Sequence, residues 1–462
     1  MTYKGGESVS QNDSHNELEG LKPVAYNKRV FRLLSYILMW WSSVIVIQGF
    51  VLGQSMLPPA GKLNFYQAVI VMVLASLILG ALYSLSGTPG LKYGIPFTVQ
   101  SRAAFGPKGS RVATIIRAIP AVFWYGIGTW IGAMAINQIT NTLFGVGNVW
   151  VYFFLFQVIQ TLLAYKGIKS IKWFDVTMAL VLVPIMAFMM YTVVKNYGFE
   201  LSASWNSAGS WGEPFFISLV AVVGAIFTSA LNNSDLTRHL EPQKAANWVG
   251  HMVGVTVPYC FLIMLGIMSG AAVGIWDPIQ ALAELAPGVA VAVILLLFIA
   301  LAQFTTNLTM NCLPSALVIM ETTGLSWGTS VIIVGVLGIA TMPWLLFTSQ
   351  NFFSFIAYYS AFLGPVLGVM LADYFLIRKQ KLVVRDLYNT AKGIYFYKKG
   401  WNWAGLVSVL IGGIFGIIYL SYSWMIAMPV GFILYLVLYK VFDLPVGKED
   451  ELNSEPVFDI GD

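Results

Sequence analysis

The sequence LAQFTTNLTMN, residues 301–311, lies inside a long apolar run that covers residues 289–320. The run has no charged residue between positions 289 and 319, and it is long enough to cross a bilayer as a helix. Polar side chains are costly at that depth unless they face protein or a cavity. Six of them nevertheless occur in nine positions: Gln303, Thr305, Thr306, Asn307, Thr309 and Asn311.

On a helix, these polar residues form two stripes. One stripe carries hydroxyl groups, whose neutral oxygens suit a small cation, and it contains Ala302, Thr305, Thr306 and Thr309. The other carries carboxamides, which both donate and accept hydrogen bonds, and it contains Gln303, Asn307 and Asn311. The alternative interpretation is that the whole cluster only joins helices, because Ser, Thr and Asn often bond between packed membrane helices.

The composition supports a membrane protein over the whole length. The chain has 462 residues, of which 58% are hydrophobic and 10% are charged, and its mean hydropathy is +0.74. These values indicate an all-α polytopic membrane protein. The net charge of +5 does not indicate a nucleic-acid partner, because the basic residues lie between apolar runs and set orientation. Cys260 and Cys312 lie within apolar runs, so neither a disulfide framework nor a zinc site is predicted.

The sequence predicts about twelve membrane-spanning helices, which start near residues 33, 65, 115, 149, 173, 214, 249, 289, 327, 352, 403 and 425. Basic residues gather after the second, fourth, sixth and tenth runs, which predicts that both termini are cytoplasmic. The expected divisions are an N-terminal cytoplasmic segment (1–32), a ten-helix transport core (33–376), a basic cytoplasmic loop (377–401), two additional helices (402–442) and an acidic cytoplasmic tail (443–462).

Two runs are interrupted by glycine and polar residues. The first run contains Ser42, Ser43, Gln48, Gly49 and Gly53. The sixth run contains Gly224, Thr228, Ser229, Asn232 and Asn233. Interrupted spans at corresponding positions indicate an inverted repeat with a ligand site near the middle of the membrane, where unwound backbone supplies carbonyl groups. The alternative for Gly49 and Gly53 is that they only allow close packing of helices.

The third run predicts a slot for a flat ring. Trp124, Gly128 and Gly132 recur every four residues, so the indole is expected to face open space beside the two glycines. Such a face suits stacking of an aromatic ligand. The alternative is that the tryptophan marks a membrane interface and the glycines mark packed helices.

Charged groups are not expected deep in any span, since Asp175, Asp235 and Asp373 fall near the ends of their runs. Coupling through a buried carboxylate is therefore not predicted, whereas a sodium site of neutral oxygens remains available. The chain also has no HExxH, GxSxG or Walker A pattern, so it is not expected to be an enzyme or a direct user of ATP.

Five segments resemble the nucleobase–cation symporter family, which includes hydantoin, allantoin, cytosine, uracil and thiamine permeases. They are KYGIPFTVQSRAAFG (92–106), FWYGIGTW (123–130), SDLTR (234–238), AQFTTNLTMN (302–311) and LGPVLGVMLADYFLIRKQKLVVRDLY (363–388). The resemblance extends over residues 36–440. It implies the leucine-transporter fold, with two inverted five-helix repeats and two extra helices, and inward transport by alternating access with sodium or protons.

The resemblance also implies roles for individual residues. The sodium ligands would be the carbonyls of Ser42, Ile45 and Ala302 and the hydroxyls of Thr305 and Thr306. Trp124 would stack on the substrate, Asn311 would hydrogen-bond it, and Ser354 falls near a residue that gates the outer side.

Three positions depart from the family pattern. Many members have Gln at the position of Gly128 and an amide side chain at that of Val46, and hydantoin and allantoin carriers often have Trp at that of Ile226. Gln48 could supply a replacement amide. Because a site without a needed polar partner rejects the ligand that requires it, a bulkier or more apolar heterocycle is predicted.

The sequence thus predicts a monomeric secondary active transporter of the cell membrane that imports a neutral planar N-heterocycle with sodium. The heterocycle would be a nucleobase or a related compound such as a hydantoin or allantoin. Its partners would be the small-molecule substrate and the lipid bilayer, with no nucleic acid. The alternatives are a proton-coupled permease, a vitamin or nucleoside permease on the same fold, and a passive channel or scaffold.

Overall fold

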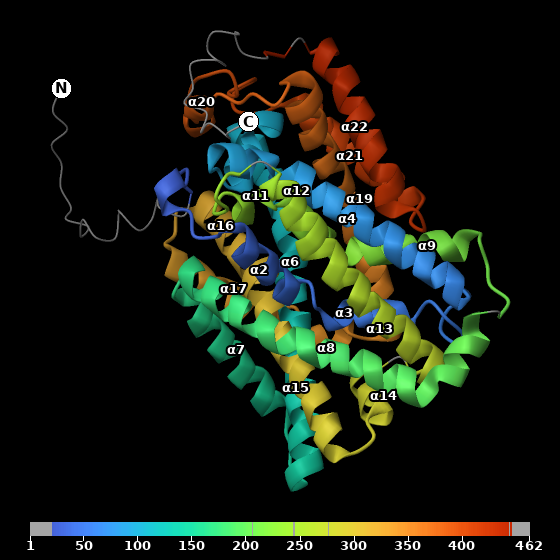
Figure 1. Ribbon diagram of the computed structural model, residues 1–462. Helices are drawn as coiled ribbons and strands as arrows, with labels where there is room; N and C mark the ends of the chain where they lie inside the picture. Colours follow the sequence, from blue (N-terminus) through green and yellow to red (C-terminus); the bar gives the residue numbers. More distant parts are fainter. Residues whose placement is uncertain (1–20, 206, 244, 276, 443, 446–462) are drawn as a thin grey trace.

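The structure is a computed structural model that describes residues 21–205, 207–243, 245–275, 277–442 and 444–445 (Figure 1). Within these residues the regular structure is helical, apart from two isolated β-bridges. Most of the predicted N-terminal segment and almost all of the predicted acidic tail lie outside the described residues.

Each predicted apolar run coincides with one helix or with a group of consecutive helices. The first five runs correspond to α2 (Leu33–Ser43) with α3 (Ile47–Gln54), α4 (Phe65–Tyr93), α6 (Arg102–Phe144), α7 (Val149–Tyr165) and α8 (Ile168–Trp205). The next five correspond to α9 (Glu213–Ala225) with α10 (Phe227–Leu231) and α11 (Ser234–Thr237), α12 (Ala246–His251) with η2 (Met252–Thr256) and α13 (Val257–Val273), α15 (Val289–Thr306) with η3 (Asn307–Cys312) and α16 (Leu313–Thr323), α17 (Trp327–Ala340), and α19 (Ser349–Leu371) with η4 (Ala372–Ile377). The last two correspond to α21 (Trp403–Ile418) and α22 (Ser423–Val441), and the connecting segments contain η1 (Tyr26–Lys28), α5 (Phe97–Gln100), α14 (Pro278–Leu285), α18 (Pro343–Leu346) and α20 (Val384–Tyr388).

The lengths of these helices fit a polytopic membrane protein. In the described part of the chain, seven helical segments are long and apolar enough to cross a bilayer, and the bent pair α2–α3 makes an eighth. The remaining predicted runs appear as shorter apolar helices of 10–17 residues: α7, α9, α17 and α21. The predicted all-α polytopic architecture is confirmed.

Local sequence explains where the long helix α4 begins and ends. The side chain of Asn64 accepts a hydrogen bond from the backbone of Gln67, whose side chain in turn accepts one from the backbone of Asn64. This reciprocal arrangement satisfies two amide groups at the helix start. The helix ends at Gly94, which has a φ of 71°, a backbone conformation that glycine adopts without a steric penalty.

The first span is broken where the sequence predicted an interruption. Its two helices, α2 and α3, meet at an angle of 55°, and Val46 between them has extended backbone angles. Gly49 and Gly53 also allow the close helix packing that the alternative interpretation expected, because both residues lie where α3 packs on α13. A Cβ atom on Gly53 would lie 2.4 Å from the carbonyl oxygen of Ile263, and one on Gly49 would lie 2.9 Å from the side chain of Leu262.

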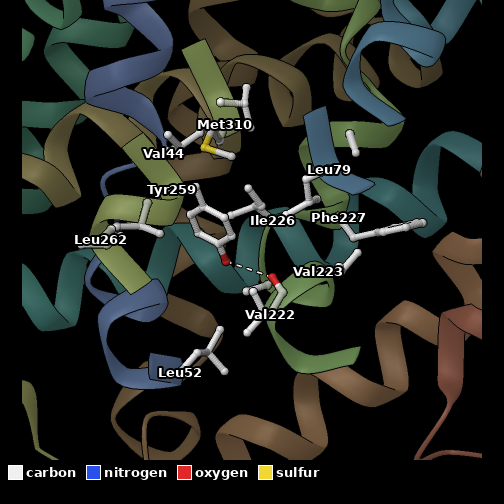
Figure 2. Packing of buried hydrophobic residues seen from close by; sticks show 14 of the residues in the cluster. Val44, Leu52, Leu79, Val222, Val223, Ile226, Phe227, Tyr259, Leu262 and Met310 are labelled. Atoms are coloured by element: carbon white, nitrogen blue, oxygen red, sulfur yellow. Dashed lines mark hydrogen bonds between the residues drawn. The ribbon is translucent and has the colours of Figure 1, made fainter. Parts of the chain in front are cut away.

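The sixth span is broken as well. Helix α9 ends at Ala225, Ile226 has non-helical backbone angles, and only the short helices α10 and α11 follow. Residues of both breaks, including Val44 and Ile226, belong to one cluster of buried side chains around Tyr259, which Figure 2 shows at close range. The two interruptions therefore meet inside the protein.

The last two helices lie on the opposite side of the molecule from α7 (Figure 1). Both α21 and α22 pack against α19. Many large apolar side chains of α7 point outward, among them Phe154, Leu155, Val158 and Leu162, which are 50–60% exposed. Such an apolar surface is appropriate for contact with lipid.

Candidate substrate and cation site

A small cavity lies where the two broken spans meet α6 and the eighth span. Its wall consists of Val46, Gln48, Trp124, Ala225, Ile226, Thr228, Ser229, Thr306, Met310 and Asn311. The cavity volume is about 20 Å³. That is room for about one water molecule, so the site is contracted in this conformation. Five of the seven residues predicted to bind substrate are in this wall: Trp124, Asn311, Gln48, Val46 and Ile226.

The threonine hydroxyls of the eighth span point at the break in the first span. Thr305 Oγ1 lies 2.9 Å from both the carbonyl oxygen of Ser42 and that of Ala302, and Thr306 Oγ1 donates to the carbonyl oxygen of Ser43 at 2.8 Å. All of these groups are buried. The structure thus brings together the predicted sodium ligands Ser42, Ala302, Thr305 and Thr306, and it adds the carbonyl of Ser43.

The fifth predicted sodium ligand, Ile45, lies in the unwound segment between α2 and α3. Its neighbours Val44 and Val46 also belong to that segment, so several backbone carbonyls there are outside regular helical bonding. Uncharged carbonyl and hydroxyl oxygens of this kind are a donor set that suits a small hard cation such as sodium.

The indole of Trp124 is held by α19. Its Nε1 donates to the hydroxyl of Tyr359 at 3.2 Å, and that hydroxyl donates to the carbonyl oxygen of Gly224 at 2.6 Å. The rings of Phe352 and Phe355 contact the indole edge-on, with centroid distances of 5.7 and 5.4 Å. Sequence reasoning missed these three α19 residues, although aromatic residues at positions 352, 355 and 359 recur on one helical face.

The expected open space beside the glycines is absent, and that prediction was wrong. A Cβ atom on Gly128 would lie 2.6 Å from Asn307 Oδ1 and 2.8 Å from Gln303 Oε1. One on Gly132 would lie 2.4 Å from the ring of Phe156. The volume that Gly128 releases is filled by carboxamides of the eighth span, and Gly128 itself is not part of the cavity wall.

The carboxamide stripe divides between two roles. Asn307 joins helices, since its Nδ2 donates to Gln160 Oε1 at 3.0 Å and to the carbonyl of Tyr125 at 3.1 Å. Asn311 lines the cavity and donates to Asn307 Oδ1 at 3.0 Å. The interpretation of the stripe as helix–helix contact therefore holds for Asn307 but not for the cavity-lining Asn311.

Two further polar groups in the cavity wall have spare hydrogen-bonding capacity. Gln48 Nε2 donates to Gln303 Oε1 at 3.3 Å, while the buried Gln48 Oε1 has no partner among the described residues. The hydroxyl oxygen of Ser229 is also buried without a partner there. Buried polar atoms of this kind are costly unless a ligand or water satisfies them.

Ser354 is not in the cavity wall. It lies on α19 and is exposed. Its predicted role near the outer gate stays a prediction.

Two charged groups of the runs are fully buried inside the protein, which the sequence did not predict. Arg117 of α6 is fully buried, and it donates to Asn232 Oδ1 at 2.7 Å and to the carbonyl oxygen of Met310 at 2.8 Å. Asp175 of α8 is fully buried too, against Ser43 and Thr309. Each charge takes its partners from distant helices, so its position within a run did not reveal its burial.

A polytopic helical protein with two broken spans around a buried polar site has the architecture of a membrane transporter. The chain matches the family described as "Permease for cytosine/purines, uracil, thiamine, allantoin" over residues 23–440, and it belongs to that family. The resemblance to nucleobase–cation symporters is thereby confirmed. The chain is a transport protein of heterocycles and not an enzyme.

Several relatives carry related names. The chain is 28% identical to the hydantoin permease of Microbacterium maritypicum, over 83% of this chain and 81% of that protein. It is 30% identical to the purine-uracil permease NCS1 of Arabidopsis thaliana, over 88% and 72% of the two chains. It is 28% identical to the allantoin permease of Bacillus subtilis (strain 168), over 92% and 93%.

Solved structures share the fold. Mhp1, a nucleobase-cation-symport-1 family transporter in a closed conformation with bromovinylhydantoin bound, has a TM-score of 0.85 and 25% identity and covers 94% of this chain and 98% of its own. A sodium-coupled sialic acid symporter has a TM-score of 0.66 at 11% identity, with 93% and 96% covered, which shows the fold alone. These neighbours confirm the predicted leucine-transporter-like fold.

Proposed function

We propose that this chain is a secondary active transporter that imports a neutral planar N-heterocycle together with sodium by alternating access. The observation that carries the proposal concerns Thr306. Its hydroxyl donates to the carbonyl of Ser43 at the first break, and the same residue borders the cavity beside Trp124. A cation and a substrate bound at these places would share one wall.

The residues around the cavity would make different kinds of contact with a bound ring. Trp124 would stack on the flat face, a contact worth about 0.5–1.5 kcal/mol beyond burial. Gln48, Ser229 and Asn311 would exchange hydrogen bonds with ring N–H and C=O groups. Because the cavity is only about 20 Å³, the substrate would enter a more open conformation of the same site.

Five groups would hold sodium: the carbonyls of Ser42, Ile45 and Ala302 and the hydroxyls of Thr305 and Thr306. The ion would supply a positive charge at the ends of the broken helix. Since Thr306 borders both places, occupancy of one would favour occupancy of the other, and sodium and substrate affinities would rise together.

The choice among heterocycles would follow from the apolar part of the wall. Val46 and Ile226 are 2–3% exposed, and both present aliphatic side chains to the cavity. Relatives are named for hydantoin, purines with uracil, and allantoin. Aliphatic side chains at these two positions would favour the more apolar members of this class over allantoin, which presents many polar groups.

Uptake into liposomes tests the proposal. The purified chain would be reconstituted and given an inward sodium gradient, and accumulation of labelled uracil, hydantoin, allantoin and thiamine would be followed with and without the gradient. Accumulation above equilibrium that collapses when sodium is replaced by potassium is the expected result. Accumulation driven only by a proton gradient would favour the proton-coupled permease, and equilibration without accumulation would favour the passive channel.

We also propose that the protein is a monomer of the cell membrane with both termini in the cytoplasm. The orientation rests on the basic connections between runs, which are retained on the cytoplasmic side. Labelling of single cysteines placed at Lys166 and Asn148, in intact cells with a membrane-impermeant reagent, tests it. We expect labelling at position 148 only.

A further inference from the structure

The buried carboxylate of Asp175 has an unusual environment. Its side chain is fully buried on α8, where it accepts a hydrogen bond from the hydroxyl of Thr309. The hydroxyl oxygen of Ser43 lies 3.4 Å from the same carboxylate oxygen, Oδ2. The second oxygen, Oδ1, is buried with no hydrogen-bond partner among the described residues. Half of this carboxylate is therefore unsatisfied.

Other buried carboxylates in the described chain lie beside a cationic side chain. Asp373 is 2.8 Å from Arg378, and Glu321 is 3.0 Å from Arg102. Asp235 has Arg238 as a neighbouring charge. Asp175 is in none of the ion pairs formed by the described residues. Among the described residues, Asp175 therefore lacks the counter-charge that the other buried carboxylates have. An isolated carboxylate at such a place is costly.

The neighbouring oxygens are oriented to accept a cation. The hydroxyl of Ser43 donates to the carbonyl oxygen of Met39 at 2.8 Å, which uses its only proton. The lone pairs of Ser43 Oγ are therefore available to coordinate a cation. Calcium, whose radius is close to that of sodium, takes oxygen ligands at about 2.3–2.6 Å, so two ligands at right angles lie about 3.4 Å apart. The 3.4 Å between Ser43 Oγ and Asp175 Oδ2 matches that spacing, whereas Thr309 Oγ1 is hydrogen-bonded to the same carboxylate oxygen and would move away from it when an ion binds.

The helix that supplies Thr309 is also irregular at this point. Residues Asn307–Cys312 form the π-helical turn η3, a local widening that frequently occurs at functional sites. Thr309 lies four positions after Thr305, and so the two hydroxyls follow one another along the same stripe. Ser43 connects the two places directly, because its carbonyl accepts from Thr306 while its hydroxyl faces Asp175.

We propose that Asp175, Thr309 and Ser43 form a second binding site for a monovalent cation of sodium's size, next to the site formed by Thr305 and Thr306. The carboxylate supplies the charge, and the two hydroxyl oxygens are further ligands. The inference rests on the proposed sodium coupling, and it adds that two ions are bound per chain rather than one. Binding of the second ion neutralises a buried charge, so this site depends on the carboxylate more than on either hydroxyl.

Equilibrium binding of ²²Na⁺ to the purified full-length chain in lipid nanodiscs tests the second site without a known substrate. We expect two sodium ions per wild-type chain. Asp175→Asn, which keeps the shape but removes the charge, should bind one. Thr305→Ala with Thr306→Ala should also bind one, and the combination of all three changes should bind none.

Two further pairs of variants control for folding. Thr309→Val should weaken the second ion at least about tenfold, whereas Thr309→Ser, which keeps the hydroxyl, should bind two ions. Thr192→Val removes a buried hydroxyl from α8 that bonds only to the carbonyl of Phe188 on its own helix, so it should leave two ions. If Asp175→Asn is not recovered as a monodisperse protein, the contrast between Val and Ser at position 309 decides.

The outcomes separate this inference from the proposed function. A wild-type chain that binds one ion, lost in Thr305→Ala/Thr306→Ala and kept in Asp175→Asn, overturns the second site and leaves the sodium coupling intact. Asp175 then carries a proton rather than a metal ion. Loss of both ions in Asp175→Asn also overturns it, since the carboxylate would belong to the first site. A wild-type chain that binds no sodium overturns both proposals.

Discussion

The two broken spans differ in the side chains that donate hydrogen bonds to their exposed backbone carbonyls. Unwinding a helix inside a membrane releases backbone carbonyls that need new partners. At the first break, the carbonyls of Ser42 and Ser43 receive the hydroxyls of Thr305 and Thr306. At the sixth span, three tyrosines donate to three carbonyls: Tyr259 to Val222 at 2.9 Å, Tyr359 to Gly224 at 2.6 Å and Tyr83 to Ile226 at 2.9 Å.

The difference between the breaks indicates different tasks. A tyrosine ring is large and packed, and in Figure 2 that of Tyr259 lies among aliphatic side chains with its hydroxyl on Val222, so it holds the sixth span in one conformation. A threonine hydroxyl is small and keeps its lone pairs available while it donates. In the proposed transporter, the first break would therefore exchange hydroxyl–carbonyl bonds for bonds to an ion, whereas the sixth would be a fixed support for the substrate.

The largest effect is expected from removing both hydroxyls at the first break. Thr305→Ala with Thr306→Ala deletes two ligands, each worth about 1.5–3 kcal/mol when the partner is charged. The sodium concentration for half-maximal uptake should rise at least about 100-fold, since each 1.4 kcal/mol is a factor of ten. Uptake measured against sodium, with potassium as replacement, checks this.

A matched control for the double change is Thr322→Ala. Thr322 lies on the same span, but its hydroxyl bonds to the carbonyl of Val318 on its own helix at 2.7 Å. Its sodium curve should coincide with that of the wild type. A wild-type sodium curve in the double variant would contradict an ion at the first break.

Removing the indole is expected to have the next largest effect. Trp124→Ala loses the stacking surface and part of the cavity wall, together about 2 kcal/mol, which corresponds to roughly 30-fold weaker substrate binding. The affinity can be measured by thermal shift, because a ligand that binds only the folded chain raises its apparent stability.

Trp130→Ala is the control for the indole. Trp130 lies on the same helix, but it packs against Trp150 and Trp344 with centroid distances of 5.1 and 5.8 Å. Its substrate affinity should stay within about threefold of the wild type. Equal losses in the two variants would mean that helix α6 is damaged rather than that a stacking partner is missing.

The comparison of the breaks also shows which features a sequence can predict. Runs of apolar residues gave the positions of the spans, because the requirement to cross a bilayer acts on every residue of a run. The interruptions and the hydroxyl stripe were visible because they depend on neighbours in sequence. The stripe placed Thr305 and Thr306 on one face, and the structure sets that face against the first span, as the family resemblance implied.

Contacts between residues that are far apart in the sequence could not be predicted from local sequence patterns. The space beside Gly128 is filled by Gln303 and Asn307, which lie about 175 positions later in the chain. Asp175 is near the start of its helix, and only the fold places Ser43 and Thr309 against it. The tyrosines of the sixth span come from three other helices, so no local pattern identifies them as partners of the break.

Tyr359→Phe is expected to have a smaller effect on transport, in which substrate affinity falls and sodium dependence does not change. The change leaves the Gly224 carbonyl and the Trp124 N–H without their partner, which should lower the free energy of unfolding by about 1–3 kcal/mol. Substrate affinity should fall about fivefold to tenfold, while the sodium curve per folded molecule stays unchanged. Tyr358→Phe on the same helix, 52% exposed, is the control and should alter neither. A shifted sodium curve in Tyr359→Phe would show that the two breaks are not separable.

The smallest effect, and the sharpest test of the comparison, is expected from Thr306→Ser. Serine keeps the oxygen that donates to Ser43 and loses only a methyl group, worth about 0.8 kcal/mol. Half-maximal sodium should therefore change by no more than about fourfold, whereas the isosteric Thr306→Val, which keeps the shape and loses the oxygen, should raise it about tenfold or more. If the serine and valine variants have the same sodium curve, then side-chain packing rather than the hydroxyl of Thr306 stabilises the first break. The two breaks would then both be stabilised by packed side chains.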